Sequence, residues 1–236
     1  MSSLQGYTEL KTARYERKFP IDDRSLKSAE ILIKNHPKLF KEIYHRRSIN
    51  NIYFDTPGMD FYLDNQDGKK ERKKVRIRWY GDLNGKIEKP ILEIKIKNGL
   101  AGTKMSFALP AFNITPSLDI ASIENSICNA NLPENVLMLL DSLKPTLINS
   151  YKRKYYQDFT KNYRITLDSD MTYYNVYKNL GSIKSMVNHG DRMVLELKYN
   201  IERDSQASNY SSYFPFRMNK HSKYVNGIEE YYSVRH

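Results

Sequence analysis

In "VRIRWYGD", residues 75–82, apolar and charged side chains alternate at the spacing of a β-strand, and this alternation is the starting point for predicting the fold. Side chains at positions i and i+2 of a strand point to the same face. Arg76 and Arg78 therefore share one face, while Val75, Ile77 and Trp79 share the other. Taken alone, this pattern is typical of an antiparallel strand whose charged face meets water.

The same alternation recurs in "RYERKF", "LEIKIKNG", "YRITLDSDM" and "VLELKY". Two architectures fit it. Helices can cover the apolar face and leave the charges in water, or the sheet can close into a barrel that turns the charges inward. The prevalence of arginine, with glutamate recurring among the cations, favours the barrel. The charged faces comprise Arg14, Glu16 and Lys18; Arg76 and Arg78; Glu93, Lys95 and Lys97; Arg164, Thr166 and Asp168; and Glu196 and Lys198.

The order of elements predicts an α+β fold, mainly antiparallel β, with a closed β-barrel and peripheral helices. A chain of 236 residues fits one domain, and we expect residues 1–236 to form it. Helical spacing predicts one helix over 24–35 and two more between 116 and 143. Residues 203–216 resemble an exposed loop, and residues 218–232 a helix interrupted by Asn226 and Gly227.

The charge of the chain indicates a polyanionic ligand. Lys and Arg number 38 against 27 Asp and Glu, a formal net charge of +11. Nucleic acid, anionic membrane and phosphate-rich small molecules all fit this charge. No helix-turn-helix, RNA-recognition or zinc-finger signature appears, so we expect no nucleic-acid partner. The sequence leaves the oligomeric state open.

The sequence also bears on location. Apolar runs fall short of the roughly 18 residues of a membrane span, so we expect no encoded membrane anchor. The first residues lack the apolar core of a signal peptide. Cys128 is the single cysteine, which fits a reducing compartment. We therefore expect a cytoplasmic protein.

Seven ordered segments together resemble the VTC domain of polyphosphate polymerases, a branch of the CYTH-like triphosphate tunnel metalloenzymes. They are "RYERKF", "VRIRWYG", "LEIKIKNG", "SYKRKYY", "YRITLDSDM", "VLELKY" and "SKYVNG". The resemblance spans nearly the whole chain. It implies the triphosphate tunnel fold, a closed antiparallel barrel whose inward Lys and Arg bind triphosphate, with a divalent metal, Mn²⁺ or Mg²⁺, held by glutamate.

The resemblance also implies roles for particular residues. Glu196 and Glu16 correspond to metal ligands. Arg14 replaces the first glutamate of the superfamily signature ExExK, which favours phosphate binding over a two-metal hydrolase. The implied substrate-binding residues are Arg14, Lys18, Arg76, Arg78, Lys95, Lys104, Arg153, Arg164, Lys198 and Lys223. The sequence supports this role for Lys220 and the role of a solvated surface lysine equally. The implied catalytic set is Lys18, Arg76, Arg78, Lys95 and Glu196.

The activity that the resemblance implies is transfer of the ATP γ-phosphate onto a polyphosphate chain. Phosphoryl transfer depends mainly on positioning and on charge stabilisation, which arginine forks and lysine point charges supply. The acceptor is an ionised phosphate oxygen, so no general base is needed. Two alternatives stay open at this point: an inorganic triphosphatase that hydrolyses tripolyphosphate, and a non-catalytic module that binds polyphosphate or an inositol pyrophosphate.

Overall fold

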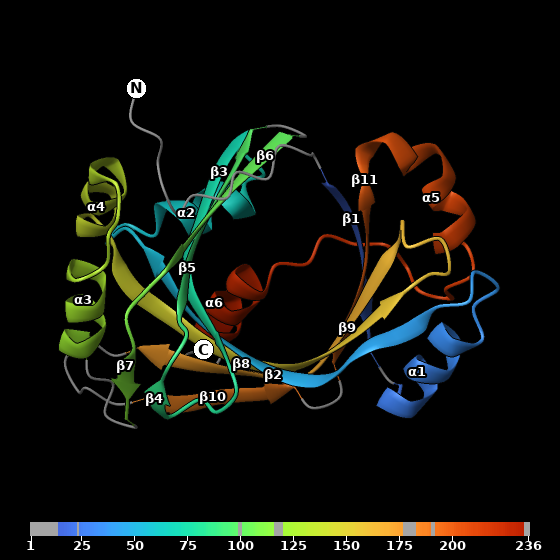
Figure 1. The fold of residues 1–236 in the computed structure, drawn as a ribbon, viewed down its shortest axis with the longest axis horizontal. Helices are drawn as coiled ribbons and strands as arrows, with labels where there is room; N and C mark the ends of the chain where they lie inside the picture. Colours follow the sequence, from blue (N-terminus) through green and yellow to red (C-terminus); the bar gives the residue numbers. More distant parts are fainter. Residues whose placement is uncertain are drawn as a thin grey trace.

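The main element of the structure is a curved antiparallel sheet (Figure 1). Its strand order is β1-β11-β9-β8-β2-β3-β5-β6, and β10 pairs with β9 off this path. The structure is a computed structural model that describes residues 14–22, 24–98, 101–115, 120–176, 183–189 and 192–233. The strands are β1 (Arg14–Ile21), β2 (Lys41–Asp55), β3 (Glu71–Tyr80), β5 (Ile91–Asn98), β6 (Ala101–Ala108), β8 (Lys144–Gln157), β9 (Arg164–Val176), β10 (Ile183–His189) and β11 (Met193–Asn200).

Helices and a small second sheet surround this main sheet. β4 (Gly85–Ile87) and β7 (Phe112–Ile114) form the second sheet. The helices are α1 (Leu26–Lys34), α2 (Asp60–Gln66), α3 (Ile120–Cys128), α4 (Glu134–Asp141), α5 (Asp204–Ser211) and α6 (Lys223–Ser233), with a 3-10 turn, η1 (Ile201–Arg203). The predicted α+β class, mainly antiparallel β, is therefore confirmed, as are the helices predicted within 24–35 and 116–143.

The predicted closure of the barrel is wrong for the described part of the chain. The sheet curves strongly but stays open, with β1 at one edge and β6 at the other. Part of the β1 edge has a different partner, because the backbone N–H of Asn219 donates to the Lys18 carbonyl over 3.0 Å. The C-terminal segment thus covers this edge at the place where a barrel would need β6.

The apolar faces of the strands form two cores on the convex side of the sheet. On one arm, Ile77 and Trp79 of β3 and Leu92 of β5 pack with Ile123 of α3 and Val136 of α4. Each of these side chains is buried. Burying a side chain of this size contributes about 1.5–3 kcal/mol, so the alternation read from the sequence is also the main source of stability here.

The second core lies on the arm that contains β1, β11 and β9. Phe19, Leu195 and Leu197 pack there against α1 and α5. The prediction of a loop over 203–216 is wrong, because α5 occupies Asp204–Ser211. Ala207 and Tyr210 lie three residues apart and are both buried. Contacts with the sheet stabilise this otherwise polar helix, which its own sequence does not predict.

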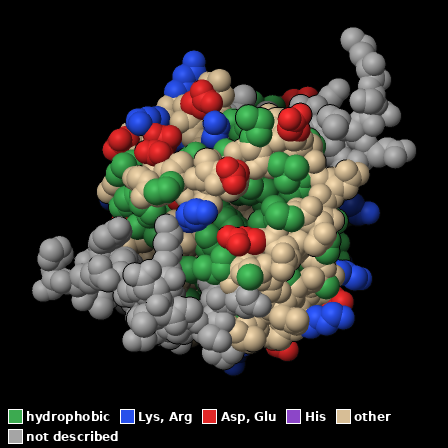
Figure 2. Space-filling model, turned by 90° about the vertical axis from the view of Figure 1, so that its left-hand side faces the viewer, with side chains coloured by type: hydrophobic (Ala, Val, Ile, Leu, Met, Phe, Trp, Pro, Cys, Tyr) green, Lys and Arg blue, Asp and Glu red, His purple; other side chains and the backbone are tan. Residues whose placement is uncertain are grey.

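One outer face of the molecule, over α3 and α4, shows hydrophobic side chains between scattered charges (Figure 2). Met138 of α4 is among the exposed apolar residues. Of the helices in the described residues, none combines the length and apolar character that crossing a bilayer would require. The single domain and the cytoplasmic location stay predictions.

Helix α6 lies on the concave side of the sheet and runs through Asn226 and Gly227 without interruption. Tyr224 stacks on Tyr53 of β2 with ring centroids 5.1 Å apart. A Cβ at Gly227 would lie 2.5 Å from Leu147 Cδ2. Glycine therefore permits the close approach of α6 to the sheet, and this approach brings Lys223, at the start of the helix, onto the concave face.

We expect Gly227→Ala to lower the free energy of unfolding, measured by denaturant titration. The new Cβ would also lie 2.6 Å from Tyr173 Cδ1, inside a buried cluster. Overpacking costs about 1–3 kcal/mol, against the ~1 kcal/mol by which alanine is favoured over glycine within a helix. Gly102→Ala is the matched control, since its Cβ would lie 3.6 Å from the Ile96 carbonyl oxygen, an ordinary van der Waals distance. Equal stability of Gly227→Ala and wild type would contradict the close-approach explanation.

Candidate anion-binding site

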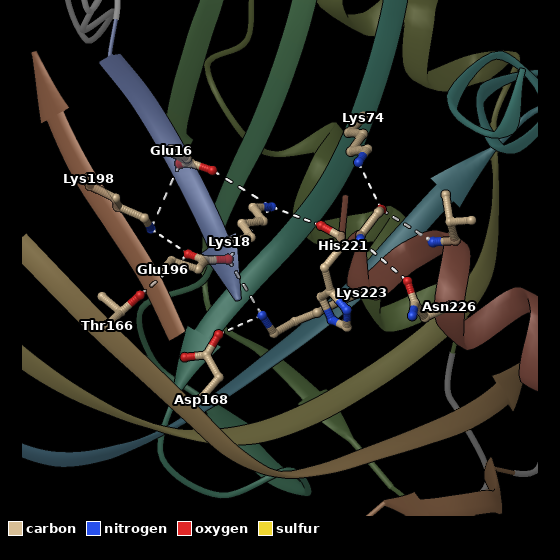
Figure 3. Close-up of polar contacts among 12 residues, drawn as sticks. Glu16, Lys18, Lys74, Thr166, Asp168, Glu196, Lys198, His221, Lys223 and Asn226 are labelled. Carbon is tan, nitrogen blue, oxygen red and sulfur yellow. Dashed lines mark hydrogen bonds and ion pairs between the residues drawn. The ribbon is translucent and has the colours of Figure 1, made fainter. Parts of the chain in front are cut away.

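Charged side chains from both arms of the sheet converge on its concave face (Figure 3). They lie there because the apolar side chains that alternate with them occupy the convex cores. We call this group the charged cluster. Its cations are Lys18, Lys74, Arg76, Arg78, Lys95, Lys104, Arg153, Lys198 and Lys223, and its carboxylates are Glu16, Glu93, Asp168 and Glu196.

Glu93 of β5 organises the arm that contains β3, β5 and β6. Its side chain is 1% exposed and accepts from Arg76 Nε at 2.8 Å and Nη2 at 2.6 Å. Arg78 Nη2 lies 3.1 Å away, and Lys104 also contacts it. Burial would raise the pKa of Glu93, but Arg76, Arg78 and Lys104 outweigh burial and hold it far below its usual range. One ionised carboxylate thus orients three cations.

Asp168 of β9 organises the other arm. Arg153 donates to both of its oxygens, with Nη2 at 2.6 Å from Oδ2, and Lys223 Nζ lies 2.5 Å from the same oxygen. Burial opposes ionisation of Asp168, yet Arg153 and Lys223 lower its pKa. The guanidinium of Arg153 on β8 and the ammonium group of Lys223 on α6 are therefore both held beside the Asp168 carboxylate.

Glu196 of β11 lies beside Asp168 and contacts several cations. Lys198 Nζ is 2.8 Å from Oε2, and Lys18 Nζ is 3.6 Å from Oε1. Burial would raise the pKa of Glu196, and the surrounding cations lower it well below its usual range. Glu16 of β1 shares Lys18 and Lys198 with Glu196. These two carboxylates therefore form a pair on neighbouring strands.

Lys74 and Lys95 have no carboxylate within ion-pair distance in the described part of the chain. In the strand register Lys74 on β3 lies opposite Lys95 on β5, and Lys95 lies opposite Lys104 on β6. Burial and the neighbouring cations lower the pKa of Lys74 to about 7. Burial likewise lowers the pKa of Lys95 to about 8, although Glu16 opposes the shift. Both lysines are therefore partly deprotonated near neutral pH, and a bound anion would favour their protonated, charged form.

A short segment, residues 219–223, joins the two arms, and we call it the strap. In it the His221 carbonyl accepts from Lys18 Nζ at 2.9 Å, while Ser222 Oγ accepts from Lys74 Nζ at 2.8 Å. Lys18 belongs to β1 and Lys74 to β3. The imidazole Nε2 of His221 is buried and has no hydrogen-bond partner among the described residues. The strap thus links the two arms of the open sheet and lines the site between them.

The structure brings most of the residues inferred from sequence into one place. Arg164 is exposed at the start of β9 and Lys220 is exposed in the strap; Lys95 is exposed too, but it lies opposite Lys74 and Lys104 within the cluster. The side chain of Arg14 lies outside the described residues, although its backbone pairs with Asn200. The residues brought together are Glu16, Lys18, Arg76, Arg78, Lys95, Lys104, Arg153, Glu196, Lys198 and Lys223.

Several residues of the cluster were not assigned to the site from the sequence. Lys74 shares its strand parity with Arg76 and Arg78, so the alternation in "RKKVRIRWYG" could have identified it. Glu93 and Asp168 appeared on charged faces, but nothing local indicates that they hold the bases in position. His221 had no sequence signal, because only the path of the strap brings it into the cluster.

Solved structures share this fold. A "putative adenylate cyclase" from Vibrio parahaemolyticus is 12% identical, with 92% of this chain and 98% of that chain covered and a TM-score of 0.50. Another "putative adenylate cyclase", from Bacillus halodurans, is 13% identical, with 91% and 98% covered and a TM-score of 0.50. Similarity at this identity shows a common fold. Comparison with curated proteins gave no significant match.

The family follows from the sequence match. The family model described as VTC domain matches residues 13–232. The chain therefore belongs to the VTC domain family, and the resemblance of its seven ordered segments to the VTC domain is confirmed.

We expect the stability of the fold to decrease as the pH falls below about 6.5, in part through His221. Burial, Lys223 and Lys18 lower the pKa of His221 to about 3. The unfolded chain takes up a proton on this histidine near pH 6.5, whereas the folded chain does not until about pH 3. The unfolded state therefore gains up to about 1.4 kcal/mol per pH unit between these values. His221→Asn should flatten the profile of unfolding free energy against pH over pH 4–6.5.

The matched control for this measurement is His45→Gln, at an exposed position outside the charged cluster. An unchanged slope in His221→Asn would show that the imidazole of His221 does not stay neutral in the folded protein.

Proposed function

We propose that the charged cluster binds the triphosphate of ATP and that the protein transfers the γ-phosphate onto a polyphosphate chain. The observation that carries this proposal is the excess of cations over carboxylates on the concave face, where Lys74 and Lys95 lie among other cations and, within the described residues, have no carboxylate at ion-pair distance. Like charges crowded together repel one another, and a bound polyanion would compensate them. Membership of the VTC domain family supports the same ligand class.

The geometry supports different roles for the arginines and the lysines of the charged cluster. Arg76 and Arg153 each have their guanidinium fixed by a carboxylate, Glu93 and Asp168 respectively. Arginines held in this way meet phosphate oxygens in a set orientation, which lowers the reorganisation needed as charge develops during transfer. Lys18 and Lys95 supply point charge from opposite arms of the sheet. Positioning and charge stabilisation of this kind are the main contributions a protein makes to phosphoryl transfer.

The carboxylate pair Glu16 and Glu196 fits a divalent cation. Both side chains offer oxygen donors, which suit Mn²⁺ or Mg²⁺, and such ions commonly take their other ligands from substrate phosphates and water. Burial would raise the pKa of Glu16, but Lys198 and other cations lower it to about 2, so it is an ionised donor at neutral pH. No group of three or more His, Cys, Asp or Glu suited to a metal occurs in the described residues. A metal here would supply charge neutralisation between phosphate oxygens.

The proposed reaction needs no side chain as a base. A terminal oxygen of the acceptor polyphosphate, already ionised, forms a new bond to the γ-phosphorus of ATP. The bond between that phosphorus and the bridging oxygen to the β-phosphate breaks, and ADP leaves with the electron pair. The acceptor is then one phosphate longer. The Lys and Arg cations of the charged cluster stabilise the charge on the transferred group throughout the reaction.

The first test is to incubate the purified protein with ATP and Mn²⁺ and to follow ADP, free phosphate and polyphosphate on a stained gel. Polyphosphate formed together with ADP is the expected result. Free phosphate with ADP would instead identify a hydrolase. Binding of polyphosphate without turnover would identify a binding module.

A second prediction concerns ligand stabilisation. Tripolyphosphate at a hundredfold excess over its dissociation constant should stabilise the fold by about 2.7 kcal/mol, seen as a rise in Tm. Arg76→Ala or Arg78→Ala should remove most of this rise, because each deletes a cation fixed by Glu93. Glu196→Ala should abolish metal-dependent turnover while retaining much of the anion binding.

The control for the arginine variants is Lys86→Ala, which removes a base that is 65% exposed on β4 and pairs with Glu88. It should keep the full rise in Tm. A full rise in both arginine variants would contradict the assignment of the charged cluster as the anion site.

A further inference from the structure

Three tyrosines and an arginine gather where the concave face reaches the surface, and we call them the tyrosine rim. The Arg47 guanidinium carbon lies 4.5 Å from the ring centroid of Tyr44, 5.7 Å from that of Tyr80 and 5.8 Å from that of Tyr155. The Tyr44 and Tyr155 rings meet edge to face at 5.6 Å. One cation is therefore shared by rings from β2, β3 and β8.

An irregularity in β2 builds the tyrosine rim. Tyr44 and Arg47 are three residues apart, so in a regular strand they would point to opposite faces. The pairing of β2 with β8 shifts register between Glu42 and Tyr44 and again between Tyr44 and Arg47. As a result Tyr44 pairs with Tyr155 and Arg47 with Arg153. Bulges of this kind re-aim side chains, and they often do so beside functional sites.

The tyrosine rim is continuous with the charged cluster. Tyr80 follows Arg78 by two residues on β3, and the guanidinium carbon of Arg78 lies 5.5 Å from the Tyr80 ring centroid. Tyr155 follows Arg153 in the same way on β8, at 6.0 Å. Two residues advance a strand by about 7 Å, so each tyrosine lies one such step beyond an arginine of the anion site.

Exposure increases along the same direction. The side chains of Arg78 and Arg153 are 18% and 12% exposed, whereas Tyr44 is 49% exposed and Tyr80 44%. A surface hollow of about 460 Å³ adjoins the rim and is lined in part by Arg46, Arg47 and Tyr80. The rim therefore offers partly exposed aromatic rings beside the charged cluster.

We propose that the tyrosine rim is a stacking site for the base of a nucleoside triphosphate whose phosphates occupy the charged cluster. This inference rests on the proposed function and adds to it a binding site for the nucleotide base. Nucleobases stack on aromatic rings and on guanidinium planes, and Tyr44, Tyr80 and Arg47 present both. Stacking accepts every base because each has a π-face, so ATP and GTP should bind with similar affinity.

The test compares two ligands on the same protein by titration calorimetry: ATP, which has a base, and tripolyphosphate, which has none. Tyr80→Ala should weaken ATP binding about tenfold, the effect of losing one stacking contact. It should leave the affinity for tripolyphosphate unchanged. Tyr80→Phe should keep the affinity for ATP because it retains the ring. Tyr44→Ala is an independent variant that tests the same site if Tyr80→Ala fails to fold.

The matched control is Tyr213→Ala, which removes a tyrosine that is 56% exposed beside His36, outside the rim. Equal weakening of ATP and tripolyphosphate in the rim variants would assign Tyr80 and Tyr44 a structural role and overturn the proposal. Unchanged ATP affinity would overturn it as well, while tripolyphosphate binding would leave the proposed function intact. If wild type bound neither ligand, the anion site itself would be refuted.

Discussion

Buried carboxylates on the concave face of the sheet hold a larger number of cations in position, and both the order and the charge of this face follow from that arrangement. Glu93 fixes Arg76, Arg78 and Lys104, and Asp168 fixes Arg153 together with Lys223. Removing one partner from such a group leaves buried charge uncompensated, which typically costs about 3–5 kcal/mol. These carboxylates are fewer than the Lys and Arg cations they orient, so they do not neutralise them. The concave face is thus ordered before any ligand arrives, yet it retains positive charge for an anion.

The open sheet makes the C-terminal segment part of the site. In a closed barrel β1 would pair with β6, and strand pairing alone would fix the distance between the arms. Here the strap connects the arms through Lys18 and Lys74, and helix α6 places Lys223 against Asp168. The close approach that Gly227 allows between α6 and the sheet therefore matters for the chemistry as well as for packing.

Much of the fold and of the site could be predicted from the alternation of side chains. It identified the apolar faces that became the two convex cores and placed Arg76, Arg78, Lys95 and Glu196 on the opposite face. It failed where long-range contacts decide the outcome. Helix α5 is polar and forms because the sheet buries Ala207 and Tyr210, and no local pattern distinguishes it from a loop.

Which side chains share a face of each strand follows from the sequence alone, because a period of two residues is a local property of extended backbone. The sequence also determined the sign of the charge on those faces. Which carboxylate holds which cation, the open edge of the sheet and the bridging by the strap become visible only in the folded chain. These features depend on strand order, sheet curvature and the irregular pairing of β2 with β8, all of which arise between segments far apart in the chain.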